Sequence, residues 1–94
     1  MDVLDEVYAV IADRKAHPKE GSYTTGLYQH RKGTDKVLEK IGEESAELII
    51  AAKNGQEEEI VHEAADLIFH TMVLLAAKDI PLAKVKEEFE RRRQ

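Results

Sequence analysis

The chain has 94 residues, of which 43% are hydrophobic and 35% are charged, and this composition indicates a single globular domain over residues 1–94. Its net charge of −5 argues against general nucleic-acid binding, because that binding gains most of its affinity from neutralising phosphates. The absence of cysteine excludes disulfides, thiolate zinc sites and cysteine nucleophiles.

An amphipathic helix is expected from Asp2 or Val3 to His17, with Asp2 as its N-cap. Pro18 disfavours helical geometry at His17 and so limits the helix there. The segment lacks the basic region of a signal peptide, so we expect a cytoplasmic protein. The apolar residues that repeat at helical spacing are Val3, Leu4, Val7, Val10 and Ile11.

The stretch from Pro18 to Gly33 contains three glycines and no apolar period, so it is expected to be a loop. At about sixteen residues it is longer than a usual structureless connection, which favours a functional or partly ordered segment. A solvated surface loop is the alternative. The stretch carries Arg31 and Lys32, and Lys36 follows it.

A long helix is expected next, with Thr34 as its N-cap and Asn54-Gly55 at its end, since glycine readily adopts the left-handed conformation that closes a helix. At about 100° per residue, a charged arc borders the apolar side instead of opposing it. The charged arc contains Lys36, Lys40, Glu43, Glu44 and Glu47, and the apolar side contains Val37, Leu38, Ile41, Leu48 and Ala52.

A second long helix is expected from about Gln56 to Lys78. The run from Ala64 to Ala77 is apolar apart from three residues, so we expect this helix to be enclosed on most sides, in part by a second copy of the chain. The run is shorter than the ~18–20 residues of a membrane span, and we expect no membrane association. Its three polar residues are Asp66, His70 and Thr71.

A last helix is expected after Asp79, with Pro81 in its first turn. Leu82, Val85 and Phe89 are spaced to form a buried stripe on it. The elements together predict an all-α fold, a four- to five-helix bundle completed by homodimerisation.

Two pairs of carboxylates mark the long helices. Glu43 and Glu47 are four residues apart, and Glu63 and Asp66 are three apart, so each pair projects from one helix face. Facing helices can aim two such pairs at one volume, and oxygen ligands of this kind suit a hard cation such as Mg²⁺, with Mn²⁺ as an alternative. Solvated acidic faces are the ordinary alternative, because EExxE patterns are common on helices.

His70 lies in the apolar run, four residues after Asp66. A core histidine usually satisfies its own hydrogen bonds, and this is the first interpretation. The second is that His70 orients Asp66, which is on the same face of the helix.

The segments GEESAELIIAAKN and HEAADLIFHTMVLLAAKDI resemble the phosphoribosyl-ATP pyrophosphatases of histidine biosynthesis, which are part of the all-α nucleoside-triphosphate pyrophosphatase (MazG-like) group with its EExxE…ExxD signature. Ser45, where alanine or threonine is usual, is a mild departure that does not affect ligation. The signature residues are Glu43, Glu44, Glu47, Glu63 and Asp66, and the likeness extends over about residues 1–93 through Ser22-Tyr23-Thr24, Leu27, Lys36, Lys40, His70, Val85, Glu88-Phe89 and Arg91-Arg92.

The resemblance implies a homodimer that hydrolyses phosphoribosyl-ATP to phosphoribosyl-AMP and pyrophosphate with Mg²⁺, the second step of histidine synthesis. Glu43 or Glu47 is expected to orient or deprotonate the attacking water. Lys40 either screens phosphate charge or only pairs with nearby glutamates. The expected metal ligands are Glu44, Glu47, Glu63 and Asp66, and the expected substrate contacts are Lys36, Lys40, Arg31 or Lys32, and Tyr23, with His70 behind the ligands.

Two other functions are compatible with the same residues. A house-cleaning pyrophosphatase would act on dNTPs or another NTP at the same site. A non-catalytic helical dimerisation module would use the apolar helices and leave the acids solvated, but it does not account for Asp66 and His70 in an apolar run.

Overall fold

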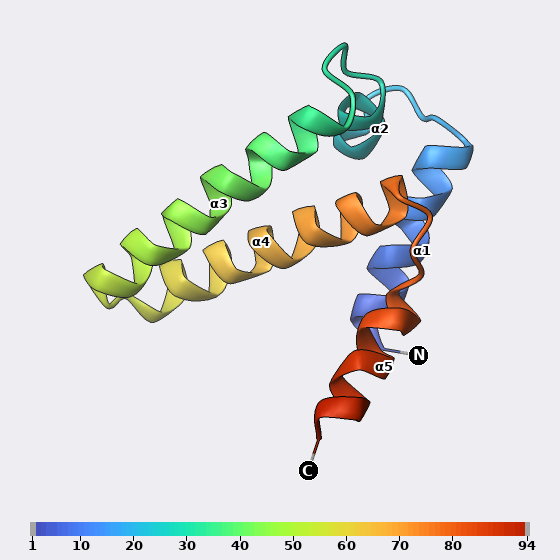
Figure 1. The fold of residues 1–94 in the computed structure, drawn as a ribbon. Helices are drawn as coiled ribbons and strands as arrows, with labels where there is room; N and C mark the ends of the chain where they lie inside the picture. The colour runs from blue at the N-terminus through green and yellow to red at the C-terminus, as the bar shows by residue number, and fades with distance from the viewer. Residues whose placement is uncertain (1, 94) are drawn as a thin grey trace.

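The computed structural model describes residues 2–93, which contain five helices and no strand (Figure 1). The all-α prediction is therefore confirmed, whereas dimerisation stays a prediction. The helices are α1 (Val3–Ala16), α2 (Tyr23–Tyr28), α3 (Thr34–Asn54), α4 (Glu57–Ala77) and α5 (Leu82–Arg92).

The helices α3 and α4 form a long antiparallel hairpin, the main feature of the fold (Figure 1). Gly55 makes the tight turn between them with φ of 78°, a left-handed conformation that a residue with a Cβ rarely adopts. The tip of the hairpin projects away from the other helices, and α1 packs against α4 at the opposite end. The hairpin thus holds the faces of α3 and α4 against each other along their length.

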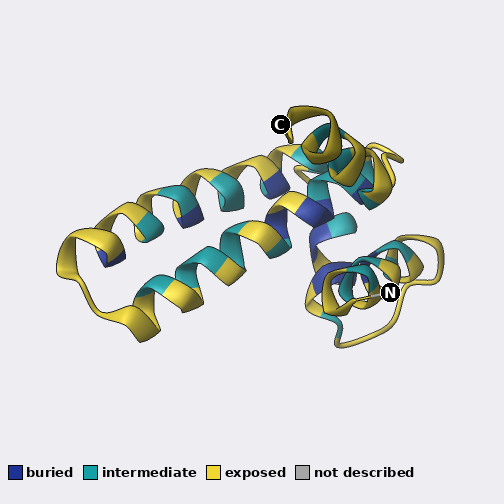
Figure 2. Ribbon diagram, turned by 90° about the horizontal axis from the view of Figure 1, so that it is seen from below, coloured by how far each residue is buried: buried dark blue, intermediate teal, exposed yellow. Residues whose placement is uncertain are grey.

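The core lies at the end of the hairpin where α1 and α2 join it. Ile11, Val37 and Val73 are fully buried there and come from three different helices. The buried positions in Figure 2 gather at this end, with a few more along the inner faces of the hairpin. Two tyrosine hydroxyls form hydrogen bonds between distant parts of the chain. The hydroxyl of Tyr8 donates to the carbonyl of Ile80 at 2.6 Å, and that of Tyr28 donates to the carbonyl of Val73 at 2.9 Å.

The structure corrects two expectations near α3. The segment from Pro18 to Gly33 is not a loop throughout, because it contains the six-residue helix α2. Ser22 caps α2 by accepting a hydrogen bond from the Thr25 amide at 3.2 Å. Thr34 is the first residue of α3 rather than its N-cap, and Gly33 occupies the cap position with φ of 60° and no side-chain cap.

The ends of the other helices agree with the sequence to within about one residue. Asp2 caps α1 as expected, in a reciprocal pair of hydrogen bonds with Asp5. The long apolar helix runs from Glu57 to Ala77, and Pro81 is the N-cap of α5 instead of lying within its first turn.

Two surfaces that the sequence predicts to be buried are open in the single chain. In α4, Val61 and Ile68 are 62% and 46% exposed, so its predicted enclosure by a second copy of the chain stays a prediction. The expected buried stripe of α5 is open at Phe89, which is 67% exposed. These apolar side chains have no cover within residues 2–93, which is the behaviour expected of surfaces that a further partner buries.

The helix α4 is also long enough and apolar enough to cross a membrane, with a mean hydropathy of 1.5 over its most apolar window. This differs from the expectation based on the shorter run from Ala64 to Ala77. Length and composition alone are weak grounds for a membrane span, because a helix at the centre of a soluble assembly has the same properties.

Candidate metal centre

Three carboxylates meet between the two helices of the hairpin. Glu44 and Glu47 are three residues apart on α3, so both project from one face, and Glu63 reaches them from α4. One oxygen of each lies within 4.8 Å of the others, a spacing that can hold a metal ion. The antiparallel packing of α3 on α4 creates this convergence, which neither helix makes alone.

Two of these carboxylates have a buried oxygen, and a buried charge without a cation or hydrogen-bond partner destabilises the fold. The Glu44 side chain is 7% exposed, and its Oε2 has no hydrogen-bond partner among residues 2–93. Oε2 of Glu63 is likewise buried and unpaired. The nearest cation to Glu44 is Lys40, whose Nζ lies 3.9 Å from Oε1. A divalent cation fits this donor set, because it would pair with both orphaned oxygens.

The pKa values of two of these carboxyls reflect the same crowding. Burial raises the pKa of Glu44, and the adjacent Glu47 carboxyl, with which it can share a proton, raises that pKa further. The adjacent Glu47 carboxyl, with which Glu63 can share a proton, raises the pKa of Glu63 to about 7, with burial as the next cause. In the absence of a cation, these two groups therefore hold protons more strongly than ordinary glutamates.

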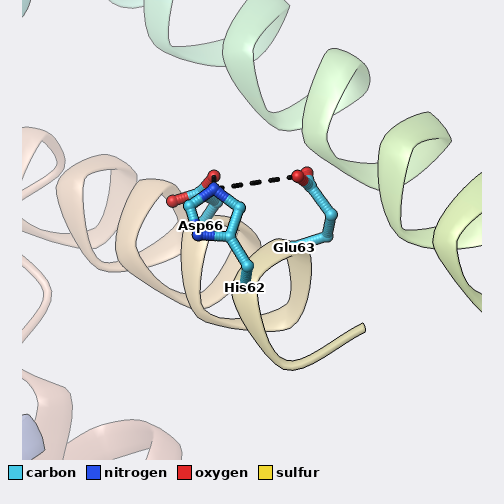
Figure 3. Close-up of side chains that lie close together, drawn as sticks. All are labelled: His62, Glu63 and Asp66. Carbon is cyan, nitrogen blue, oxygen red and sulfur yellow. Dashed lines mark ion pairs between the residues drawn. The ribbon is translucent and has the colours of Figure 1, made fainter. Parts of the chain in front are cut away.

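Asp66 lies at the edge of the group, beside a histidine that the sequence analysis did not select. Nε2 of His62 is 3.3 Å from Oδ2 of Asp66 and 3.9 Å from Oε1 of Glu63 (Figure 3). These three residues form a second set whose ligand atoms lie within 4.8 Å of one another. The sequence does indicate this contact, because His62 and Asp66 are four residues apart and so lie on the same face of the helix.

Glu43 does not join the three central carboxylates. Its side chain is 57% exposed, and its Oε2 lies 3.4 Å from Nζ of Lys40. Lys40 thus pairs with both Glu43 and Glu44, which is the ordinary role considered for it. Ser45 turns its hydroxyl to the carbonyl of Ile41 at 2.8 Å and does not face the ligand set.

His70 and Tyr23 form a pair behind the site. Nδ1 of His70 donates to the main-chain carbonyl of Asp66 at 2.9 Å, so Nε2 is left to accept from the Tyr23 hydroxyl, also at 2.9 Å. His70 therefore contacts the backbone of Asp66 and not its carboxylate, which corrects the simplest form of the orienting hypothesis. His70 is 5% exposed with both ring nitrogens bonded, as the first interpretation had it.

The basic residues expected to bind substrate lie before or along the N-terminal half of α3. Lys36 is half-buried on α3, one helical turn before Lys40, and Arg31 is exposed in the segment before the helix. Lys32 pairs with Glu39 at 2.9 Å. Tyr23 is 54% exposed on α2, and its ring lies beside Phe69. Their roles toward a substrate stay predictions.

A groove of about 370 Å³ runs beside the carboxylates toward the tip of the hairpin. Glu47, His62 and Glu63 line it together with the apolar side chains of Ile50 and Ala51. The candidate ligands are therefore reachable from solvent through a partly apolar surface.

Comparisons with known proteins point to one family. The family model described as "Phosphoribosyl-ATP pyrophosphohydrolase" matches residues 4–93. The phosphoribosyl-ATP pyrophosphatase of Methanocella arvoryzae is 83% identical over 93 residues, which cover 99% of this chain and 98% of the relative. The proteins of the same name from Methanococcoides burtonii and Pelobacter propionicus are 54% and 56% identical, over 99% and 96% of this chain and 94% and 82% of their own lengths.

Proposed function

Because the chain belongs to the phosphoribosyl-ATP pyrophosphohydrolase family, we propose that it hydrolyses the α–β phosphoanhydride of phosphoribosyl-ATP to phosphoribosyl-AMP and pyrophosphate. Membership makes it a hydrolase, and the reaction is the second step of histidine biosynthesis. We place the activity in the cytoplasm. Family membership carries the substrate, and the observation that carries the metal-dependent part of the proposal is the meeting of Glu44, Glu47 and Glu63, two of which have a buried carboxylate oxygen with no partner among residues 2–93.

The proposed cofactor is Mg²⁺, with Mn²⁺ as an alternative, held by Glu44, Glu47 and Glu63, with Asp66 at the edge of this set as the fourth expected ligand. A set of carboxylate oxygens suits these hard cations, which commonly take further ligands from water and phosphate. When bound, the cation supplies charge neutralisation at the phosphate oxygens and a water of lowered pKa.

The residues of the chain have separate tasks in this proposal. Glu47 orients the attacking water and accepts its proton, because it lies within the cluster, whereas Glu43 is exposed and paired with Lys40. Lys36 and Arg31 screen the remaining negative charge of the triphosphate. Tyr23 keeps its segment against α4 through its hydrogen bond to His70, and its exposed side chain contacts the substrate.

We also propose that the active form is a homodimer. The exposed apolar residues of the hairpin support it, since they lie in a stripe on each helix: Leu38 and Ile49 are eleven residues apart on α3, and Val61 and Ile68 are seven apart on α4. Stripes of this kind on two neighbouring helices suit burial against a second hairpin.

The direct test measures pyrophosphate released from phosphoribosyl-ATP in the presence of Mg²⁺. We expect the wild-type chain to release pyrophosphate and no orthophosphate, and Glu47→Gln and Asp66→Asn to lose activity by about a hundredfold or more. Glu6→Gln, an exposed change on α1, is the matched control and should keep full activity.

Full activity in both site variants would refute the assignment of the metal centre. A higher kcat/KM on dNTPs than on phosphoribosyl-ATP would replace the proposed substrate with a house-cleaning one while leaving the site in place.

A further inference from the structure

We propose that His62 is a metal ligand, and that it forms with Glu63 and Asp66 a second cation position beside the all-oxygen position of Glu44, Glu47 and Glu63. The mixed nitrogen and oxygen donors of this second position favour a transition-metal cation such as Co²⁺ or Zn²⁺ over Mg²⁺. The inference rests on the proposed function in one respect, namely that the carboxylate cluster holds a divalent cation.

The distances in the second set suit a shared ion. Two ligand atoms that each lie about 2.1 Å from one cation are about 3.0 Å apart at right angles and about 4.2 Å apart on opposite sides. Nε2 of His62 lies 3.3 Å from the Asp66 oxygen and 3.9 Å from the Glu63 oxygen, so both separations fall between these limits (Figure 3). These two separations are compatible with a shared ion, and the Glu63 and Asp66 oxygens lie within 4.8 Å of each other.

A second observation points to a cation at this junction. The carboxylate of Glu63 is common to both sets, and its two oxygens have different surroundings. Oε1 faces His62, whereas Oε2 is buried with no hydrogen-bond partner in the described chain. Behind it, the nine-tenths buried side chain of Glu44 also has an oxygen without a partner. Glu63 is thus placed to join two cations, one on each side.

The chemistry of the donors separates the two positions. Imidazole nitrogen is a softer ligand than carboxylate oxygen and binds transition metals more strongly than it binds Mg²⁺. His62 is 71% exposed, so an ion can reach its ring from solvent. Removal of His62 should therefore weaken the binding of Co²⁺ far more than that of Mg²⁺, whose ligands are the carboxylates.

The competing explanation is an ordinary i,i+4 ion pair between protonated His62 and Asp66. The chain contains such a pair elsewhere, because Nδ1 of His17 lies 3.0 Å from Oδ1 of Asp13. In residues 2–93 that pair has no place in a set of metal-binding groups. His17 is therefore a matched control for the effect of losing one exposed histidine beside an aspartate.

The test is calorimetric titration of the substrate-free protein with Co²⁺ and, separately, with Mg²⁺, for the wild-type chain, His62→Gln and His17→Gln. We expect His62→Gln to lose about tenfold or more in Co²⁺ affinity with little change for Mg²⁺, and His17→Gln to match the wild type. In the proton NMR spectrum of the Co²⁺-loaded wild type, a strongly shifted exchangeable imidazole N–H should appear and should vanish in His62→Gln.

Three results would overturn the inference and leave His62 in an ion pair. They are an equal loss of Co²⁺ and Mg²⁺ affinity in His62→Gln, no loss of affinity for either cation, and the absence of the shifted resonance in the wild type. In those cases a wild-type chain that still binds Mg²⁺ and releases pyrophosphate retains its proposed function. A wild-type chain that binds neither cation overturns both proposals.

Discussion

At the scale of single residues, the carboxyl group of Glu63 links the metal centre to the stability of the fold. The adjacent Glu47 carboxyl, with which it can share a proton, raises its pKa from 4.5 to about 7 when no cation is present. Between these values the folded chain keeps a proton that the unfolded chain has released. The stabilising contribution is therefore complete below about pH 4.5 and is lost as the pH rises through about 7.

This sign leads to a prediction for the metal-free protein. In the presence of a chelator, its free energy of unfolding should fall as the pH rises from about 5 to about 8, and Glu63→Gln should remove most of that fall because glutamine carries no titrating proton. Urea unfolding at a series of pH values measures it. Equal slopes in the wild type and Glu63→Gln would show that the crowding of carboxylates at Glu63 does not govern the pH response.

Residue spacing in the sequence identified the carboxylates, but it did not show which of them enter the metal set and which pair with Lys40. The i,i+3 and i,i+4 intervals place Glu43, Glu47, Glu63 and Asp66 on helix faces, which is local information. Glu43 turns to Lys40, and Glu44 becomes the most buried acid of the group. Those positions depend on how α3 is rotated about its axis against α4. The spacing of residues within one helix does not determine that rotation. The sequence prediction did not include His62, because the acidic pattern points to oxygen ligands and a lone histidine beside it is no part of that pattern.

At the scale of secondary structure, the long helices were predictable and the short one was not. The helices α1, α3 and α4 are long and have recognisable ends such as Asp2 and Gly55. The six residues of α2 have a glycine in the middle and too few positions for a period. Tertiary contacts hold α2 instead, since Thr24, Thr25 and Leu27 are buried and Tyr28 bonds to α4.

The turn of the hairpin gives a prediction at this scale. Gly55→Ala should lower the free energy of unfolding by about 1–2 kcal/mol, because alanine is strained at a φ of 78°. The control is Gly26→Ala in α2, where a Cβ meets open space and φ is not positive. Chemical denaturation of both variants measures the difference. A Gly55→Ala variant as stable as Gly26→Ala would contradict the role of Gly55 in closing α3.

At the scale of the whole molecule, the chain leaves much of its long hairpin uncovered. Val61, Ile68 and Ile49 are exposed, although the core at the other end of the hairpin is well closed around Val73. The sequence predicted that a second copy covers α4, and the exposure found in residues 2–93 is what that prediction requires. Periodicity alone did not show which positions stay open, because Leu38 has the pattern of a core residue and is 49% exposed.

The dimer prediction is tested by mass in solution. The wild-type chain should have twice the 10.6 kDa mass of one chain in light scattering, and Ile68→Glu should lower the mass toward that of a single chain, because a charge in an apolar interface is costly. Val10→Glu replaces a similarly exposed residue on α1 and should stay dimeric. A monomeric wild type, or a dimeric Ile68→Glu, would contradict the assignment of this face.

The central claim is that the carboxylates of α3 and α4 hold a divalent cation between the two helices. The most direct measurement is an anomalous difference map from crystals soaked in Mn²⁺, recorded near the manganese absorption edge. The strongest peak should lie between Glu44, Glu47 and Glu63, within about 2.5 Å of an oxygen of each. A map with no peak at that place, or with its only peaks at other acidic residues, would contradict the claim.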